Sequence, residues 1–129
     1  MKSIVIFSLV ILSFWTHAFE LTDADISGKW GVASIEMGNL GEIPAGKDDF
    51  FQFNNGIFTS SAMGETSNPA PYSLENDTIV ISHSSKTEKL KVLEVTEEKM
   101  IFIADIYINE KKMSAGNIKF TIRRSSSGN

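Results

Sequence analysis

The strand-like part of the chain begins with the stretch I-S-G-K-W-G-V-A, residues 26–33. Gly28 permits the close approach of another part of the chain, and Trp30 supplies a large flat ring at the start of the first expected strand. A ring in that position suits the narrow, closed end of a small barrel, because its volume fills the space there. We therefore expect Gly28 and Trp30 to take part in the closure of a β-barrel.

The other end of the strand-like region carries a matching signal in F-T-I-R-R, residues 120–124. Alternation places Arg124 on the same apolar face as Ile122. In an antiparallel barrel with an even number of strands, the end of the last strand lies beside the start of the first. Arg124 is thus expected to stack its guanidinium group on the ring of Trp30, a contact worth about 1 kcal/mol, and Arg123 is the alternative candidate.

Segments rich in β-branched and aromatic residues recur about every ten residues along the rest of the chain. Joints such as Asn54-Asn55-Gly56 and Glu75-Asn76-Asp77 suit tight hairpins, because Asn, Asp and Gly tolerate the backbone that these turns require. No internal segment has a sustained helical period, apart from a short turn expected within Leu21 to Ile26 with Thr22 as its N-cap. The pattern predicts an all-β fold, a small eight-stranded antiparallel up-and-down barrel. Its eight expected strands are Gly28 to Glu36, Asp49 to Asn54, Gly56 to Met63, Tyr72 to Glu75, Thr78 to His83, Glu88 to Thr96, Lys99 to Ile108 and Asn117 to Arg124.

Two features of the alternation have more than one explanation. The apolar residues change face near Val92-Leu93, and either a β-bulge or burial on both faces explains this change. The segment from Lys99 to Tyr107 is apolar on both faces. Its outer side, with Ile101 and Ile103, is therefore either covered by another element or a contact surface.

The start of the chain has the pattern of a secretory leader. Lys2 precedes an apolar run from Ile4 to Trp15, and the small residues Thr16 and Ala18 end it. We expect cleavage after Ala18 and export to the periplasm or the medium; the alternative is an uncleaved leader that acts as an anchor. The expected division is a signal peptide at 1–18, an N-terminal arm at 19–25, a barrel domain at 26–124 and a disordered tail at 125–129.

Cysteine content and charge exclude several classes of function. The chain has no cysteine, so it forms no disulfide and offers no thiolate ligand to a metal, and an exported domain without disulfides favours a bacterial source. Its net charge is −4, and removal of the leader, which holds Lys2 and no acid, makes the charge more negative. Nucleic acid and anionic membrane are therefore not expected as partners.

The chain is also poorly supplied with catalytic groups. His17 belongs to the leader, which leaves His83 as the only imidazole, and we expect it to be an ordinary surface residue at a strand end. Neighbouring acids such as Asp48-Asp49 point to opposite faces or to water, so they do not form an acid–base pair. The sequence predicts a protein that is not an enzyme and that holds no metal and no cofactor.

The segment G-K-W at residues 28–30, about eight meandering strands and an arginine at the end of the last strand together resemble the calycin group. The resemblance is to the short lipocalin-like domains of bacterial exported proteins and covers residues 26–124. It implies a closed barrel that binds a small apolar molecule, or a barrel filled by its own side chains.

Aromatic residues provide the candidate binding site. We expect a pocket at the open rim, lined by aromatic side chains and by two irregular loops, Gly38 to Lys47 and Gly64 to Pro71; a fully packed core is the alternative. The leading hypothesis is a binding module for a small, partly apolar ligand. The alternative is a protein-interaction module, such as an inhibitor of an exported enzyme, that presents its loops or its N-terminal arm. The candidate ligand-binding residues are Phe51, Phe53, Phe58, Tyr72 and Phe102, and those for barrel closure are Gly28, Trp30 and Arg124.

Overall fold

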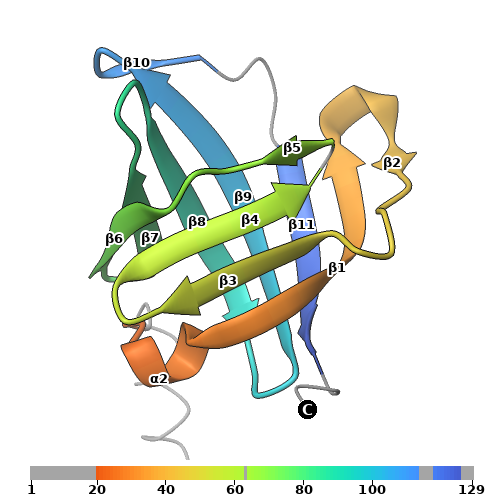
Figure 1. Cartoon of the computed structure of the whole chain (residues 1–129). Helices are drawn as coiled ribbons and strands as arrows, with labels where there is room; N and C mark the ends of the chain where they lie inside the picture. The colour runs from red at the N-terminus through yellow and green to blue at the C-terminus, as the bar shows by residue number, and fades with distance from the viewer. Residues whose placement is uncertain (1–19, 63, 114–117, 126–129) are drawn as a thin grey trace, which may run out of the picture.

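A computed structural model describes residues 20–62, 64–113 and 118–125 (Figure 1). The expected signal peptide and most of the expected tail lie outside these ranges. Within them, no helix has the length and apolar character needed to cross a membrane.

The described chain consists of one short α-helix, one 3-10 helix and eleven strands, of which three have only two residues. Their bounds are α2 (Asp23–Ile26), β1 (Gly28–Met37), η1 (Gly38–Leu40), β2 (Glu42–Ile43), β3 (Phe50–Asn54), β4 (Ile57–Ala62), β5 (Glu65–Thr66), β6 (Ala70–Glu75), β7 (Thr78–Ser82), β8 (Thr87–Val95), β9 (Lys99–Ile108), β10 (Lys111–Lys112) and β11 (Ile118–Arg124).

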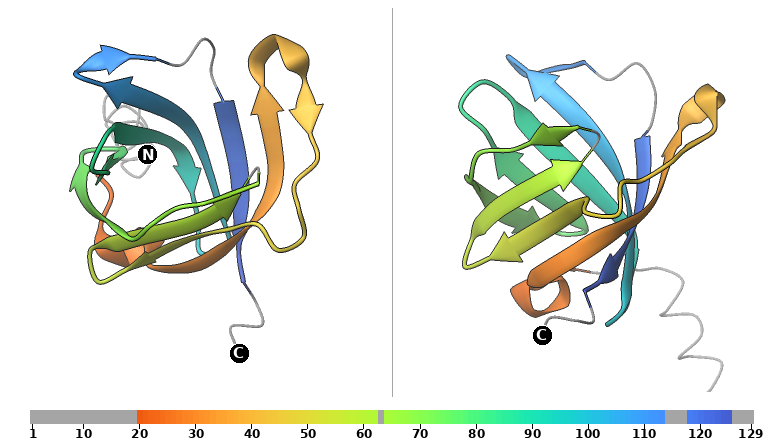
Figure 2. Two further views of the ribbon diagram at one scale, coloured as in Figure 1. Left: turned by 45° about the horizontal axis from the view of Figure 1, so that its top comes forward. Right: turned by 45° about the vertical axis from the view of Figure 1, so that its right-hand side comes forward.

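The eight long strands form one closed antiparallel barrel, as the two further views show (Figure 2). Each long strand pairs with the next one along the chain, from β1 through β3, β4, β6, β7, β8 and β9 to β11. The last strand then pairs with the first, with Trp30 opposite Arg124 and Met37 opposite Ile118. The predicted eight-stranded up-and-down barrel is confirmed, with each expected strand present.

The two segments expected to be irregular loops are partly ordered into strands, which corrects that expectation. Gly38 to Lys47 contains η1 and β2, and β2 pairs back onto β1. Ile43 and Ala45 of this segment pack against the buried core, and this packing favours the folding of β2 back onto β1. Gly64 to Pro71 contains β5, which pairs with β4, and the first two residues of β6.

The turns and bulges follow from local chemistry. Asn55, Gly56 and Asn76 adopt positive φ angles of 53°, 81° and 57° in the hairpins after β3 and β6, as expected for such residues in tight turns. The register of β8 against β9 shifts between Val92 and Glu94, so a β-bulge explains the change of face. A second shift, in β1, was not expected from the sequence.

The core lies inside the barrel and is made of side chains that alternate along each strand. Trp30, Phe53, Phe58 and Phe102 are the largest fully buried side chains. Leu21 and Ile26, which precede the barrel, also belong to this core. The buried apolar residues are Leu21, Ile26, Trp30, Ile35, Phe51, Phe53, Phe58, Ala70, Ile79, Ile81, Leu90, Val92, Met100, Phe102, Ala104, Phe120 and Ile122.

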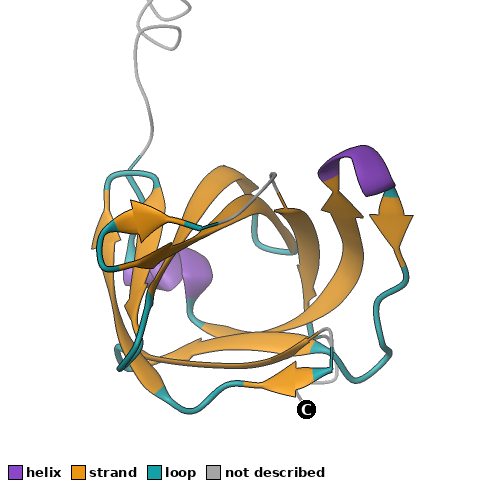
Figure 3. Cartoon of the chain, turned by 90° about the horizontal axis from the view of Figure 1, so that it is seen from above, coloured by secondary structure: helices purple, strands orange, loops and turns teal. Residues whose placement is uncertain are grey.

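The lower end of the barrel is closed by α2, which is visible through the ring of strands when the molecule is seen from above (Figure 3). Thr22 is the N-cap of α2, and its N–H donates to the Asp25 carboxylate at 2.9 Å. The N–H of Leu21 donates to the carbonyl of Asn76 at 2.8 Å, which ties the segment before α2 to the turn after β6. Residues 21–26 therefore pack under the barrel and do not extend from it as a free arm.

Arg124 connects the end of the last strand to this closed end. Its guanidinium carbon lies 4.2 Å from the centre of the Trp30 ring, so Arg124 and not Arg123 takes the stacked position. Its Nη2 donates to the carbonyl of Asp25 at 3.1 Å and its Nε to that of Glu97 at 2.9 Å, while Nη1 donates to Ser27. One side chain thus joins β11, the junction of α2 with β1, and the turn between β8 and β9.

Gly28 makes this arrangement possible in two ways. Its φ angle is +112°, a conformation that residues with a side chain rarely adopt. A Cβ atom at this position would lie 2.9 Å from Nη1 of Arg124. The absence of a side chain at Gly28 therefore gives the guanidinium group its place against the backbone.

We expect Gly28→Ala to destabilise the protein by about 1–3 kcal/mol, because alanine strains the backbone and displaces Arg124 from the Ser27 carbonyl. Gly31→Ala is the matched control in the same strand, since the nearest atom to its new Cβ is 4.0 Å away. Urea unfolding of the two variants measures the difference. Equal midpoints for Gly28→Ala and the wild-type protein would contradict this account of closure.

A second contact joins α2 to the barrel wall. The hydroxyl of Tyr72, on β6, donates to the Asp23 carboxylate at 2.9 Å. Burial of the phenol, together with its hydrogen bond to Asp23 and the negative charge of that group, raises the pKa of Tyr72 to about 12. The neutral phenol is therefore stabilised in the folded protein relative to the unfolded chain, where the pKa is about 10.

This contribution to stability is complete below pH ~10 and is lost as the pH rises towards ~12, because the folded-state pKa is the higher one. Alkaline titration, followed by phenolate absorbance, should show one late component that disappears in Tyr72→Phe and persists in the control Tyr107→Phe. Tyr72→Phe should also lose less unfolding free energy than the wild-type protein across this pH range. A late component that survives in Tyr72→Phe would show that the Asp23 contact is not its cause.

Candidate functional site

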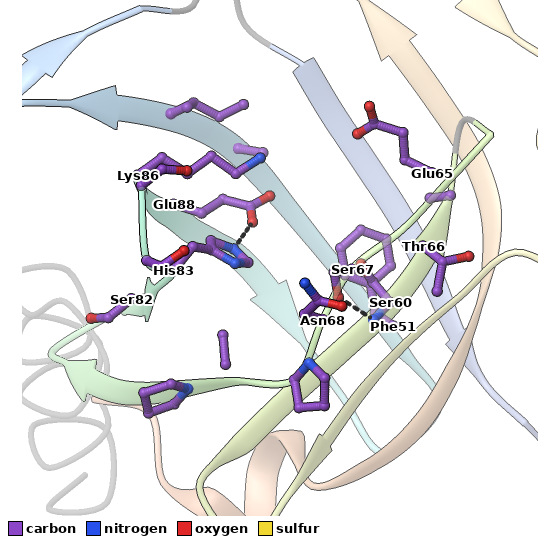
Figure 4. A pocket seen from close by; sticks show the side chains of 18 of the residues that line it. Phe51, Ser60, Glu65, Thr66, Ser67, Asn68, Ser82, His83, Lys86 and Glu88 are labelled. Atoms are coloured by element: carbon purple, nitrogen blue, oxygen red, sulfur yellow. Dashed lines mark hydrogen bonds and ion pairs between the residues drawn. The ribbon is translucent and has the colours of Figure 1, made fainter.

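The upper half of the barrel contains a cavity of about 1010 Å³ that opens to solvent (Figure 4). Its apolar wall comes from the strands β3, β4, β6, β9 and β11, and Ser60 on β4 is a polar residue within it. Its polar wall comes from the segment that contains β5, from the turn between β7 and β8, and from Glu88 at the start of β8. The apolar lining residues are Phe51, Ala62, Pro69, Ala70, Pro71, Ala104, Ile106, Ile118 and Phe120.

Phenylalanine rings form the floor of the cavity. The ring centres of Phe51 and Phe120 are 5.2 Å apart with an edge-to-face tilt, and Phe102 stacks on Phe120 at the same distance. On the other side of the cluster, the ring centre of Phe58 lies 5.7 Å from that of Phe51 and 5.2 Å from that of Phe53. These rings fill the barrel below the cavity and give it a rigid apolar base.

The structure distributes the candidate ligand-binding residues over the cavity and the core below it. Phe51 lines the cavity. Phe53, Phe58 and Phe102 are fully buried and do not line it, so they act through packing beneath its floor. Tyr72 is half-buried at the closed end. Its ring centre lies 5.4 Å from that of Phe53, and its hydroxyl donates a hydrogen bond to Asp23.

The wall beside the cavity is held to β4 in three places. β4 pairs with β6 at Ile57–Pro71 and Phe58–Ala70, and its upper part pairs with β5. Between these pairings the N–H of Ser67 donates to the carbonyl of Ser60 at 2.8 Å, while Pro69 and Pro71 have no N–H group to donate. Residues 65–71 and residues 82–86 both line the cavity.

The rim differs from the expected one. The segment Gly64 to Pro71 contributes its residues from Glu65 onward, as the sequence suggested. Gly38 to Lys47 does not line this cavity; part of it borders a separate shallow groove of about 350 Å³ on the outside of the barrel. Its place at the rim is taken by the turn Ser82 to Lys86, which the sequence analysis did not select.

A polar pair faces the interior at the top of β7 and β8. Nε2 of His83 lies 3.0 Å from Oε1 of Glu88, and the two side chains are 14% and 19% exposed. The His83 ring also packs edge-on against the ring of Phe58, with 6.4 Å between the two ring centres. Figure 4 shows the pair on one wall, with the side chain of Lys86 above it and Ser60 and Ser67 across the space.

His83 is therefore not the ordinary surface residue that the sequence analysis expected. The signal that identifies it is its position in the alternation. Ile79, Ile81 and His83 share one face of β7 and its continuation, and Glu88 shares the inward face of β8 with Leu90. A polar residue that continues the apolar face of a strand is a candidate for the lining of a cavity.

The pair does not by itself form a catalytic site. Ser-His-acid catalysis requires a serine hydroxyl bonded to the imidazole, and among the described residues the hydrogen-bond partner of the His83 imidazole is Glu88. Among the same residues no three side chains of the metal-binding kinds come together. The arrangement places hydrogen-bonding groups on the wall of the cavity.

The outer face of β9 is partly covered. Ile101 and Ile103 are half-buried, and Ile103 borders the shallow groove beside Gly38 and Gly41. The ammonium group of Lys89 lies 4.9 Å from the ring centre of Tyr107. The apolar outer side of β9 is therefore partly covered, and Ile101 and Ile103 do not form a fully exposed contact surface.

In comparisons with known proteins, no protein-family model, no curated protein and no solved structure matches the chain.

Proposed function

We propose that the chain is an exported, non-enzymatic barrel of lipocalin-like type that binds a small, partly apolar molecule in the cavity of its upper half. The observation that carries this proposal is the cavity of about 1010 Å³, which stands on a floor of Phe51 and Phe120 and opens to solvent. Ligand pockets in proteins commonly measure about 300–1,000 Å³ and combine apolar walls with a few polar groups. The cavity lies at the upper end of this size range and joins an apolar wall to a polar one.

The size and chemistry of the walls set the expected affinity. A ligand that covers the rings and the aliphatic residues Ile106 and Ile118 gains about 25 cal/mol for each Å² of apolar surface removed from water. Association entropy and the desolvation of the polar wall offset part of this gain. We expect micromolar dissociation constants for simple apolar probes.

The alternative function, a protein-interaction module with a side-chain-filled barrel, fits the molecule less well. The lower half of the barrel is filled, but small side chains such as Ala62 and Ala104 leave the upper half open. The segment at 21–26, which the alternative presents to a partner, is packed against the barrel through Leu21 and Ile26. Both features support ligand binding over that alternative.

The first test fills the cavity from one strand. Ala104 on β9 points inward and lines the cavity, whereas its neighbour Ile103 points outward. We expect the neutral dye Nile red to bind saturably at about one per chain, and Ala104→Phe to weaken this binding at least about tenfold by occupying the space.

Ile103→Phe is the matched control and should leave the dye affinity within about twofold, with the fold of both variants checked by urea unfolding. Unchanged binding in a folded Ala104→Phe protein, or no saturable binding by the wild-type protein, would contradict the proposed cavity function.

The second test concerns export. Because the small residues Thr16 and Ala18 occupy the third and the first positions before the expected cleavage point, the mature protein should begin at Phe19. N-terminal sequencing of protein secreted by a bacterial host checks this, and Ala18→Lys should block processing. An exported protein that begins at Met1 would contradict it.

A further inference from the structure

The cavity has one fixed charged group on its polar wall. Glu88 lies in the middle of the sheet between β7 and β9, opposite Ile81 on one side and Ile106 on the other. Because both neighbours hold its backbone, its side chain projects inward from a rigid position. Its side chain is only 19% exposed, so its charge acts in a partly desolvated space.

His83 fixes the orientation of this carboxylate. An ionised carboxylate only accepts hydrogen bonds, so the imidazole supplies Nε2–H to Oε1 at 3.0 Å. The ring of His83 is itself held edge-on by Phe58. The second oxygen, Oε2, makes no hydrogen bond to the described residues. It is the acceptor that the wall offers to a ligand.

We infer that Glu88 selects the head group of the ligand, and that the cavity takes an amphipathic amine. This inference rests on the proposed binding function. The apolar body of the ligand lies against Phe51 and Phe120, and its ammonium group donates to Oε2 of Glu88. His83 is a positioning residue that acts through Glu88.

The other charged residues that line the cavity support a cationic head group over an anionic one. Glu65 is an exposed second carboxylate on the opposite wall, so two acids and one lysine border the space. Lys86 lies in the turn Ser82 to Lys86, and a lysine carries its charge on a flexible four-carbon stem that can move into solvent. Glu88 cannot move away in the same manner, because its strand and His83 hold it. A carboxylate head group would meet its fixed charge at short range.

The test uses three probes that share one alkyl chain and differ in the head group: decylamine, decanol and decanoate. Each is titrated below its micelle concentration, at one neutral pH, by calorimetry and by displacement of Nile red. The wild-type protein should bind decylamine about tenfold or more tightly than decanoate, as expected for one charge-assisted hydrogen bond. Decanol should fall between them.

Five substitutions at four residues assign the effect. Glu88→Gln should lower the decylamine affinity about tenfold and leave decanol within about twofold, whereas the control Glu65→Gln should change neither by more than about twofold. Lys86→Met should leave decylamine binding unchanged or stronger. His83→Leu should reduce the preference for the amine, and His83→Gln, which keeps an N–H donor, should restore it.

The outcomes separate this inference from the proposed function. Decanol binding with no preference for the amine, a preference that survives Glu88→Gln, or tighter binding of decanoate that depends on Lys86 would overturn the inference and leave the cavity function standing. If the folded protein binds none of the three probes, the cavity function fails and the inference fails with it.

Discussion

Closure of the barrel depends on the guanidinium group of Arg124. It donates to backbone carbonyls at residues 25, 27 and 97 and lies over the ring of Trp30. These groups come from both ends of the described chain and from the turn between β8 and β9. The indole N–H of Trp30 in turn donates to the carbonyl of Ile26 at 2.8 Å, which fixes α2 under the barrel. A cation with several donors in one plane suits this junction, because a single side chain serves three carbonyls. The stacked pair then excludes water from the lower end.

The two halves of the barrel differ in the size of their inward-facing side chains. In β9 the inward series runs from Met100 and Phe102 to Ala104, and in β4 it runs from Phe58 to Ser60 and Ala62. Large rings therefore fill the lower half, and small residues above them leave a space on a rigid floor. An eight-stranded barrel has just enough interior for its own side chains or one small ligand, and this chain divides its interior between the two.

The polar wall defines the chemistry of the cavity. A partly buried carboxylate is costly without a partner, and His83 supplies one to Glu88 at 3.0 Å. The pair lies across from aromatic rings, so an occupant meets an apolar surface and a charged surface at once. For the amphipathic amine that we propose as ligand, the rings would contribute burial and the fixed carboxylate would contribute selectivity. The pair lines a cavity that opens to solvent, which reduces the cost of the charge.

The sequence by itself determined the all-β class, the eight strands, their hairpin turns and the pairing of the first strand with the last, because these follow from local alternation, turn chemistry and closure. It also identified Gly28, Trp30 and Arg124, although the choice of Arg124 over Arg123 required the register. Tertiary structure alone decided which phenylalanines line a space and which fill one, since Phe51 and Phe53 share a face of β3 but lie at different heights in the barrel. It also brought His83 to Glu88 across a turn and removed the η1–β2 segment from the rim. Strand alternation specifies inside or outside, whereas depth along the barrel axis depends on the stagger of all the strands together.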